Sequence, residues 1–171
     1  SGQPIINYLN MINEEFYCWD DSEKTRNKLI KLDRNINLVK PDDINLKQID
    51  ELFITPGISF DNKNLNLFKD NNIKFYRDLE LYSRISKNKK VIAITGTNGK
   101  STTTKLVSDV LKKNKIMNFK GGNLGIPLLD FTKKNNAIEH HVIELSSFQL
   151  EAFDTFSPFI SILLNIAPDH L

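Results

Sequence analysis

Residues 91–102 read VIAITGTNGKST, and this stretch decides the fold class of the chain. The apolar run at 91–94 is typical of a buried strand, and the stretch beyond Lys100 has helical periodicity. The apolar positions that carry this periodicity are Leu106, Val107, Val110 and Leu111. A glycine loop between a strand and a helix lets backbone N–H groups approach phosphate oxygens, and the helix N-terminus adds positive potential. The stretch therefore predicts a nucleoside triphosphate site.

The loop at 95–102 supplies the residue types that such a site needs. Lys100 can neutralise the β- and γ-phosphates, and the Ser101 hydroxyl can hold Mg²⁺. Ile94 stands where the common pattern G-x-x-x-x-G-K-[ST] has its first glycine, so the loop is a shortened variant. An ordinary glycine turn is the alternative, and the Lys-Ser-Thr sequence at the helix start argues against it. We predict ATP or GTP with Mg²⁺ as cofactors, bound by Gly96, Thr97, Asn98, Gly99, Lys100, Ser101 and Thr102.

The composition narrows the class of protein further. The chain has 171 residues, of which 40% are hydrophobic, and this is enough for one large or two small packed domains. Its net charge of +2 gives no electrostatic case for binding nucleic acid or a membrane, and no apolar run is long enough to cross a bilayer. One cysteine, Cys18, excludes an internal disulfide and fits a reducing compartment, so we predict a cytoplasmic protein.

The first half of the chain is typical of an α/β domain. Ser1 is able to cap a helix with Pro4 in its first turn, and a short strand at 16–19 is followed by Asp20. Helix, strand and acidic residue follow each other in the second half of a Rossmann-like βαβ unit. Further elements are expected as strands at 36–39, 52–55 and 73–75 and a helix at 78–86. We assign residues 1–84 to a Rossmann-like domain whose first strand is missing, which implies that the true N-terminus lies upstream.

The second half is typical of part of a parallel-sheet domain at 91–171, which follows a lysine-rich linker at 85–90. Strands are expected at 91–95, near 116–119, at 141–145 and at 159–164, with a helix at 100–113. Short apolar strands that alternate with helices imply a parallel sheet, which binds ligands at the carboxyl ends of its strands. The phosphate loop, Glu144 and His170 all lie at or just after predicted strands. We therefore expect them to converge on one edge of one sheet.

Several polar residues have both a functional and a structural interpretation. Glu144 lies near the end of a buried strand, where burying a carboxylate costs free energy unless it is paired or bound to a metal. The upstream phosphate loop favours a Mg²⁺ ligand over a structural ion pair. A loop histidine such as His170 is often only polar surface. Asn123 fits a turn that tolerates left-handed geometry, and Asp20 fits a cap for the following helix. The histidines at 140–141 lie at the start of a strand, away from the ligand edge, so we expect them to be structural or exposed.

Four segments together resemble the Mur ligases, the ATP-dependent amide-forming enzymes of peptidoglycan precursor synthesis. They are 95–103 (TGTNGKSTT), 122–127 (GNLGIP), 144–150 (ELSSFQL) and 164–171 (LNIAPDHL), and their order and spacing fit the family. The ELSSFQL run is the most specific, because other Mur ligases and folylpolyglutamate synthases look different there. It favours the branch of the family that adds D-glutamate to UDP-N-acetylmuramoyl-L-alanine.

The resemblance implies a three-domain parent enzyme, in which the first domain holds the uridine diphosphate part of the substrate and the central domain holds ATP. Lys100 would bind the β- and γ-phosphates. Ser101 and Glu144 would hold one Mg²⁺, and His170 would bind a second. Asn123 would reach the sugar nucleotide. The substrate-binding residues of the first domain would be Ser1, Gly2, Asp20, Asp21, Ser22, Thr55, Pro56 and Gly57.

On this resemblance the reaction passes through an acyl phosphate, with Lys100, Glu144 and His170 as the catalytic residues. The muramoyl-alanine carboxylate would attack the γ-phosphate, and the amine of D-glutamate would then release phosphate. We expect a bacterial enzyme that is monomeric at full length. The adenine-contacting segment, a carbamoylated lysine and a third domain would follow residue 171. The 171-residue chain alone should therefore be inactive, and its incomplete sheet should leave an unpaired edge.

Three other interpretations stay open on the sequence. Another Mur-type ligase or a folylpolyglutamate synthase would use the same loop, and the ELSSFQL run argues against both. A non-catalytic nucleotide-binding module derived from such an enzyme would keep the same residues. A P-loop kinase or GTPase would need a Walker-B-like aspartate or a guanine-reading motif, and neither is evident. Asp169 follows a strand, yet its Asn-x-x-Pro-Asp-His context fits the ligase better.

Overall fold

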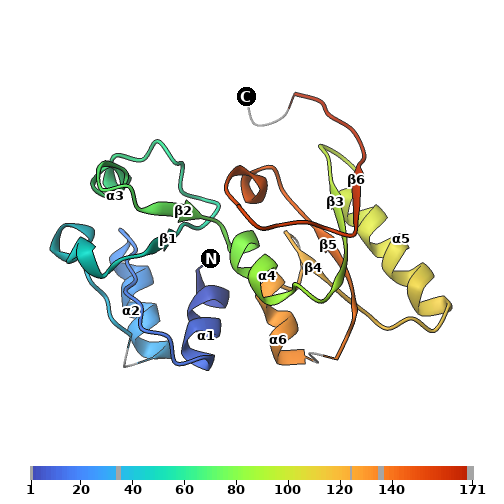
Figure 1. The fold of residues 1–171 in the computed structure, drawn as a ribbon, viewed down its shortest axis with the longest axis horizontal. Helices are drawn as coiled ribbons and strands as arrows, with labels where there is room; N and C mark the ends of the chain where they lie inside the picture. Colours follow the sequence, from blue (N-terminus) through green and yellow to red (C-terminus); the bar gives the residue numbers. More distant parts are fainter. Residues whose placement is uncertain (1, 34–35, 124, 135–136, 169–171) are drawn as a thin grey trace.

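The chain folds as an α/β protein with two separate parallel sheets (Figure 1). This architecture comes from a computed structural model, which describes residues 2–33, 36–123, 125–134 and 137–168. A two-stranded sheet lies in the N-terminal half and a four-stranded sheet in the C-terminal half. The strand pairings within both sheets are parallel, as the alternation of short apolar runs with helices predicted.

The four-stranded sheet has the strand order β4-β5-β3-β6. Its strands are β3 (Lys90–Thr95), β4 (Asn118–Gly122), β5 (His140–Glu144) and β6 (Ile160–Leu163). In the register of the sheet, Ile94 and Gly122 both lie opposite Glu144, and Thr95 lies opposite Leu163. The carboxyl ends of the strands therefore meet at one edge, and the loop at 95–102 leaves the sheet there.

Helix α5 (Lys100–Lys113) covers one face of this sheet (Figure 1). Its bounds agree with the predicted helix at 100–113. Val107 and Leu111 of the helix pack against Ile92, Ile94 and Val142 of the strands. The apolar residues of the helix and the alternate residues of β3 and β5 thus form a small core on this face.

Elements from both halves of the chain pack on the opposite face. They are α1 (Gln3–Met11), α4 (Asp78–Ile85), the 3-10 turn Leu128–Asp130 and α6 (Phe131–Lys134). The buried side chains that meet there include Ile5, Leu79, Tyr82, Phe119, Phe131 and Ile143. One core therefore joins residues from before and after the lysine-rich stretch at 85–90. The division into domains at 1–84 and 91–171 stays a prediction.

The N-terminal half holds the smaller sheet, with β1 (Glu51–Phe53) paired to β2 (Lys74–Tyr76) near the predicted strands. Its other elements are α2 (Glu23–Leu32), α3 (Asn66–Asp70) and 3-10 turns at Pro41–Asp43, Leu46–Gln48 and Lys63–Leu65. The predicted strands at 16–19 and 36–39 are wrong, because only one bridge joins Cys18 to Leu38. Acidic residues flank the bridge at 14–15 and 20–21, so the apolar run is too short to extend the pairing.

The β6 edge of the larger sheet is apolar and exposed. Phe159 and Leu163 are 68% and 61% exposed, and Leu106 and Val110 of α5 are also exposed. In the described part of the chain, no strand pairs with the outer side of β6. The unpaired edge expected from the sequence is therefore present there. No described helix is both long and apolar enough to span a membrane.

Candidate functional site

The loop between β3 and α5 has a shape that only glycine permits at two positions. Gly99 is the N-cap of α5 with φ +86°, and Gly96 has φ +140°. A Cβ atom on Gly96 would lie 3.0 Å from the carbonyl oxygen of Asn165. The two glycines therefore allow the loop to turn sharply at the edge of the sheet and to lie against the segment that follows β6.

Lys100 folds back over this loop. Its Nζ donates to the carbonyl oxygens of Gly96, at 2.6 Å, and Thr97, at 2.9 Å. These contacts keep the ammonium group beside the loop at the N-terminal end of α5, where the helix dipole also favours an anion. The lysine, the glycines and the helix end thus lie together where the sequence predicts a phosphate site, and their role in binding phosphate stays a prediction.

Asn165, which follows β6, contacts this loop, and the sequence did not predict that contact. Its backbone oxygen accepts from Thr97 N, and its side chain accepts from Asn98 N and donates to the Asn98 carbonyl, all within 3.0 Å. Thr97 Oγ1 also donates to the carbonyl oxygen of Ala167 at 3.1 Å. The segment after β6 thus fixes the outer half of the phosphate loop. The polar run after a buried strand signalled a ligand-edge loop but not these partners.

Glu144 ends β5 and faces the start of α5. Its side chain is 2% exposed, and Ser101 Oγ donates to its Oε2 at 2.8 Å. Asn123 Nδ2 donates to its Oε1 at 3.2 Å, and Asn123 N donates to its carbonyl oxygen. The structure therefore brings together three of the residues predicted for the site. Ser101 comes from the first turn of α5, Glu144 from the end of β5 and Asn123 from the loop after β4, all at the same edge of the sheet.

Two glycines let Asn123 come this close to Glu144. Gly122 has φ +123°, and a Cβ there would lie 2.0 Å from the Glu144 carbonyl oxygen. A Cβ on Gly121 would lie 2.6 Å from the carbonyl oxygen of Ile126. A side chain at either position would therefore push the end of β4 away from β5 or from its own loop.

The environment of Glu144 fits a divalent cation. Both carboxylate oxygens accept from neutral donors, and among the described residues no lysine or arginine forms an ion pair with them. A buried carboxylate without a positive partner is costly, and a bound cation would remove that cost. Within the described ranges, no cluster of three His, Cys, Asp or Glu side chains could hold a metal. Mg²⁺ suits such a site, because it keeps several waters and takes its other ligands from phosphate.

The residues predicted for the first domain form a separate local structure. Asp20 Oδ1 accepts from Ser22 N, and Ser22 Oγ caps α2 by accepting from Thr25 N. Asp21 accepts from Trp19 Nε1 at 3.1 Å and from an asparagine at position 64. The helix cap is therefore Ser22, and Asp20 shapes the turn before it. Gly2 caps α1, and Ser1 lies outside the described residues, as do Asp169 and His170.

The turn at Thr55, Pro56 and Gly57 follows β1 and lies near the start of α1. A Cβ on Gly2 would be 3.5 Å from Thr55 Cγ2. Two of the predicted substrate-binding segments of the first half are thus neighbours. The structure does not bring residues 20–22 into a described hydrogen bond with this turn.

His141 has a structural environment, as expected. It is fully buried, its Nδ1 lies 2.8 Å from the Tyr82 hydroxyl, and its ring contacts those of Phe119 and Phe131. Burial lowers the pKa of His141 to about 4, and the positive charges of Lys89 and His140 contribute. The imidazole is therefore neutral at physiological pH and belongs to the core.

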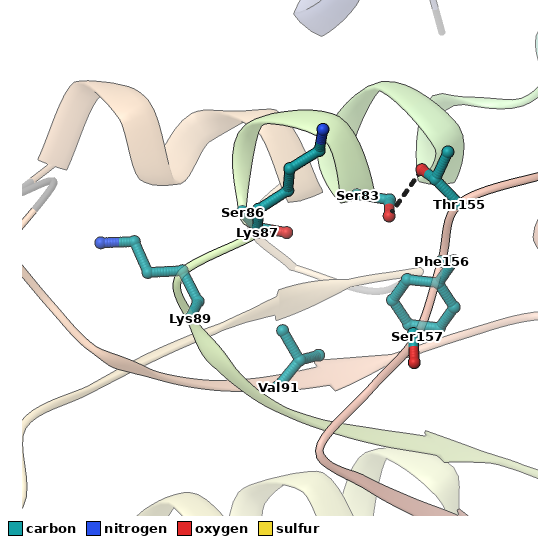
Figure 2. A pocket seen from close by; sticks show the side chains of 8 residues that line it. All are labelled: Ser83, Ser86, Lys87, Lys89, Val91, Thr155, Phe156 and Ser157. Atoms are coloured by element: carbon teal, nitrogen blue, oxygen red, sulfur yellow. Dashed lines mark hydrogen bonds between the residues drawn. The ribbon is translucent and has the colours of Figure 1, made fainter.

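A small cavity of about 180 Å³ lies at the opposite end of β3 from the phosphate loop (Figure 2). Ser83 of α4, Val91 of β3 and Ser157 before β6 are among the residues that line it. It contains none of the residues predicted for the site. The candidate site is therefore the edge at the carboxyl ends of the strands rather than this cavity.

Comparisons with known proteins show which proteins this chain is similar to. Residues 94–171 match the family model of the Mur ligase middle domain. The UDP-N-acetylmuramoylalanine--D-glutamate ligase of Rickettsia bellii is 39% identical over 154 residues, which cover 90% of this chain and 34% of the relative. The ligase of the same name from Wolbachia pipientis wMel is 38% identical over 173 residues, 100% of this chain and 33% of the relative. The chain thus spans about a third of the length of these curated relatives.

A solved structure supports the fold. The UDP-N-acetylmuramate:L-alanyl-gamma-D-glutamyl-meso-diaminopimelate ligase of Neisseria meningitides superposes with a TM-score of 0.51 and 14% identity. The match covers 95% of this chain and 56% of that chain. At this low identity the similarity concerns the arrangement of the elements alone.

Proposed function

We propose that the protein joins D-glutamate to UDP-N-acetylmuramoyl-L-alanine with ATP, starting from the match of residues 94–171 to the family model of the Mur ligase middle domain. The single observation that carries the proposal is the convergence of Ser101, Glu144 and Asn123 beside the Lys100 loop. The site combines a phosphate cradle, a buried carboxylate without a cationic partner and an amide. The relatives at 38–39% identity, which carry the name of this ligase, support the choice of substrates.

Lys100, Glu144 and Ser101 have different roles in the proposed transfer of the γ-phosphoryl group. Lys100 lies beside the loop, where its ammonium group can move from the loop carbonyls to the β- and γ-phosphate oxygens of ATP. Glu144 and the Ser101 hydroxyl would hold Mg²⁺, which neutralises charge on the phosphates when bound. The muramoyl-alanine carboxylate then attacks the γ-phosphorus, and ADP leaves. Because both reacting groups are anionic, charge neutralisation and positioning dominate the barrier to this acyl-phosphate step.

The substrate side of the proposal comes from the first half of the chain. We place the uridine diphosphate near a Rossmann-like region at 1–84, with Gly2, the turn at 55–57 and residues 20–22 as its contacts. Asn123 would reach the sugar nucleotide from its position beside Glu144. His170 would hold a second Mg²⁺. The D-glutamate amine attacks the acyl carbonyl, and the amide forms as phosphate leaves.

Phosphate release tests the proposal on the gene product that carries residues 1–171. We expect release that requires ATP, Mg²⁺, UDP-N-acetylmuramoyl-L-alanine and D-glutamate together, with other amino acids as controls. Lys100→Ala should lower turnover by about 100-fold or more, since a preorganised charge at the transferred phosphate is lost. Near-normal ligation by Lys100→Ala would contradict the assignment. ATP binding without turnover under all conditions would instead favour a nucleotide-binding module.

A further inference from the structure

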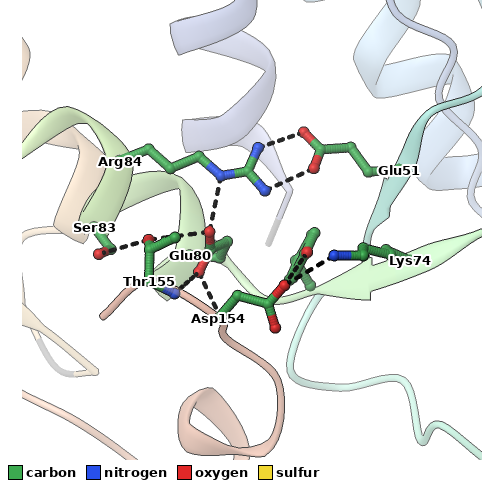
Figure 3. Close-up of polar contacts among 8 residues, drawn as sticks. Glu51, Lys74, Glu80, Ser83, Arg84, Asp154 and Thr155 are labelled. Carbon is green, nitrogen blue, oxygen red and sulfur yellow. Dashed lines mark hydrogen bonds and ion pairs between the residues drawn. The ribbon is translucent and has the colours of Figure 1, made fainter. Parts of the chain in front are cut away.

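Hydrogen bonds join the segment after β5 to the segment that runs from β2 into α4, although the two are about 75 positions apart in sequence. Glu80 of α4 is fully buried and accepts from the backbone N–H groups of Asp154 and Thr155 and from Arg84 Nε (Figure 3). Burial raises the pKa of Glu80, but these donors outweigh it, so its pKa is lowered overall. Asp154 also accepts from the Tyr76 hydroxyl at 2.6 Å and from Lys74. The two segments are therefore held together by the buried carboxylate of Glu80 and by the more exposed carboxylate of Asp154.

Arg77 lies at the centre of this junction and joins it to the turn after β1. Its side chain is 1% exposed, and its NH1 donates to the carbonyl oxygens of Thr55, at 2.6 Å, and Ile58, at 3.0 Å. Its NH2 donates to the carboxylate of Glu151. Its guanidinium also lies over the Phe60 ring, 4.3 Å from the centroid. One side chain thus holds both ends of the 55–58 turn and the 3-10 turn Phe148–Glu151.

The Phe148–Glu151 turn is in turn connected to the end of β5. Leu150 N donates to the Ser146 carbonyl, and the Gln149 side chain accepts from Ser146 N. Leu145 is bonded to β3 on both sides, through its N–H to Ile94 O and through its carbonyl, which accepts from Thr95 Oγ1. The Phe148–Glu151 turn is therefore anchored to the end of β5, which β3 holds in place next to Glu144.

We propose that Arg77 is a positioning residue, which sets the 55–58 turn relative to Glu144 by bonding the turn and Glu151 at once. The inference rests on the proposed function, in which this turn contacts the sugar nucleotide. The planar fork of arginine can bond several acceptors at fixed angles, which neither lysine nor an apolar residue can do.

The cost of this arrangement argues for a role beyond packing. Arg77 Nε is buried without a hydrogen-bond partner, and leaving a buried donor unpaired is unfavourable. Replacing a buried ion pair by well-packed apolar residues is often neutral or stabilising, so stability alone does not require a guanidinium here. What the guanidinium adds is a defined direction for the carbonyl groups of Thr55 and Ile58.

Arg77→Gln tests the inference, and Arg84→Gln is the matched control. Arg84 lies two turns after Arg77, the N-cap of α4, and makes a bidentate ion pair with Glu51, at 2.7 Å for both bonds. Its described hydrogen bonds go to Glu51 and Glu80 and none goes to the 55–58 turn. Dissociation constants for UDP-N-acetylmuramoyl-L-alanine and for ATP with Mg²⁺ would be measured by calorimetry on the gene product that carries residues 1–171. Arg77→Gln should weaken sugar-nucleotide binding about 10- to 100-fold and leave ATP binding unchanged.

The controls separate positioning from stability. Arg84→Gln should lower the unfolding midpoint without changing either dissociation constant. Glu151→Gln, at a side chain that is 39% exposed, should fold normally and weaken sugar-nucleotide binding by a smaller factor. Arg77→Lys restores the charge but not the fork, so it should recover little of the lost affinity.

Three results would overturn the inference. If Arg77→Gln and Arg84→Gln lost the same amount of affinity for the sugar nucleotide, Arg77 would be a stabilising residue only. Wild-type affinity for the sugar nucleotide in Arg77→Gln would remove the positioning role and leave the proposed function intact. A wild-type protein that binds ATP but no UDP-N-acetylmuramoyl-L-alanine would overturn the proposed substrate, and the inference with it.

Discussion

Strand β5 carries two buried ionisable side chains, His141 and Glu144, whose surroundings are opposite in kind. Both are almost inaccessible, at 0% and 2% exposure, so burial does not distinguish them. His141 lies among aromatic rings with its Nε2 unpaired, while both oxygens of Glu144 accept hydrogen bonds from polar side chains. The chemistry of the neighbours, and not depth in the protein, separates the structural residue from the candidate metal ligand.

The pleat of the strand explains the difference. Residues three apart on a strand point to opposite faces of the sheet. Glu144 points to the same face as Val142, which packs under α5, and Ser101 is in the first turn of that helix. His141 points to the other face, as does Ile143, and meets Tyr82 of α4 there. Glu144 is also at the end of the strand, where the loops are polar.

Gly122→Ala should have the largest effect on stability, because the new side chain on β4 would collide with the end of β5. The new Cβ would lie 2.0 Å from Glu144 O at a φ of +123°, so we expect a loss of unfolding free energy of about 3 kcal/mol or more. Urea unfolding measures it. Gly125→Ala is the control, since φ is +94° but no atom lies within 4 Å, and it should cost only about 1–2 kcal/mol. Equal losses would show that the close approach of β4 to Glu144 has no energetic weight.

The pH dependence of stability should come next in size. The pKa of His141 is about 4 in the folded protein and ordinarily 6.5, so between these values the unfolded chain binds the proton and the folded one does not. Stability should therefore fall as pH drops from 6.5 towards 4, by at most roughly 3 kcal/mol. His141→Asn keeps a partner for the Tyr82 hydroxyl but cannot titrate. If unfolding free energies of this variant showed the wild-type slope, another group would be responsible.

Glu144→Gln should differ from the substitutions above, because we expect a large effect on Mg²⁺-dependent ATP binding and a small effect on stability. The amide keeps the shape of the side chain but not its charge, so the gain in ATP affinity on adding Mg²⁺ should fall at least about 10-fold. Calorimetry of ATP binding with and without Mg²⁺ measures this gain. His141→Asn is the control, in which the gain in ATP affinity should stay as in the wild type. A Mg²⁺ dependence unchanged in Glu144→Gln would remove Glu144 from the metal site.

Two buried hydroxyl groups of α5 should give the smallest effects, and they test whether polar partners decide the value of a buried group. Thr104 Oγ1 is buried without a partner, whereas Ser108 Oγ donates to Asn118 Oδ1 at 2.6 Å. Thr104→Val should stabilise the protein by up to about 1 kcal/mol, and Ser108→Ala should destabilise it by about 1 kcal/mol. Opposite signs in thermal unfolding would confirm that partners decide the value of a buried polar group. Equal signs would contradict this.

The agreement between sequence and structure is best where the signals are local. The helix after the phosphate loop runs over the predicted residues, because a strand, a glycine turn and a helical apolar stripe all lie within about twenty positions. The strand expected near 116–119 is instead Asn118–Gly122. Its start is set by the contact of Asn118 with Ser108, and it runs into the glycines because they can approach β5. Neither cause is visible in the apolar pattern.

Residues whose contacts are distant in sequence were not found. Arg77 bonds the turn 22 positions before it and Glu151 74 positions after it, and Asn165 holds a loop 67 positions before it. A single arginine or asparagine has no periodicity, so nothing in its local sequence marks it as buried. The predicted strands at 16–19 and 36–39 were wrong for a related reason, since a strand needs a partner of sufficient length.

The sequence by itself indicated the glycine loop as a phosphate site, the helix that follows it and the candidate role of Glu144. The loop and the helix depend on the order of residue types along a few consecutive positions, where backbone geometry alone brings the groups together, and the role of Glu144 was inferred from the presence of that loop upstream. Only the tertiary structure decided that Ser101 and Asn123 meet Glu144, that His141 is a neutral core residue and that Arg77 connects the two halves. Those outcomes depend on which strands pair and which helix covers which face, because burial and partners arise only when distant segments pack.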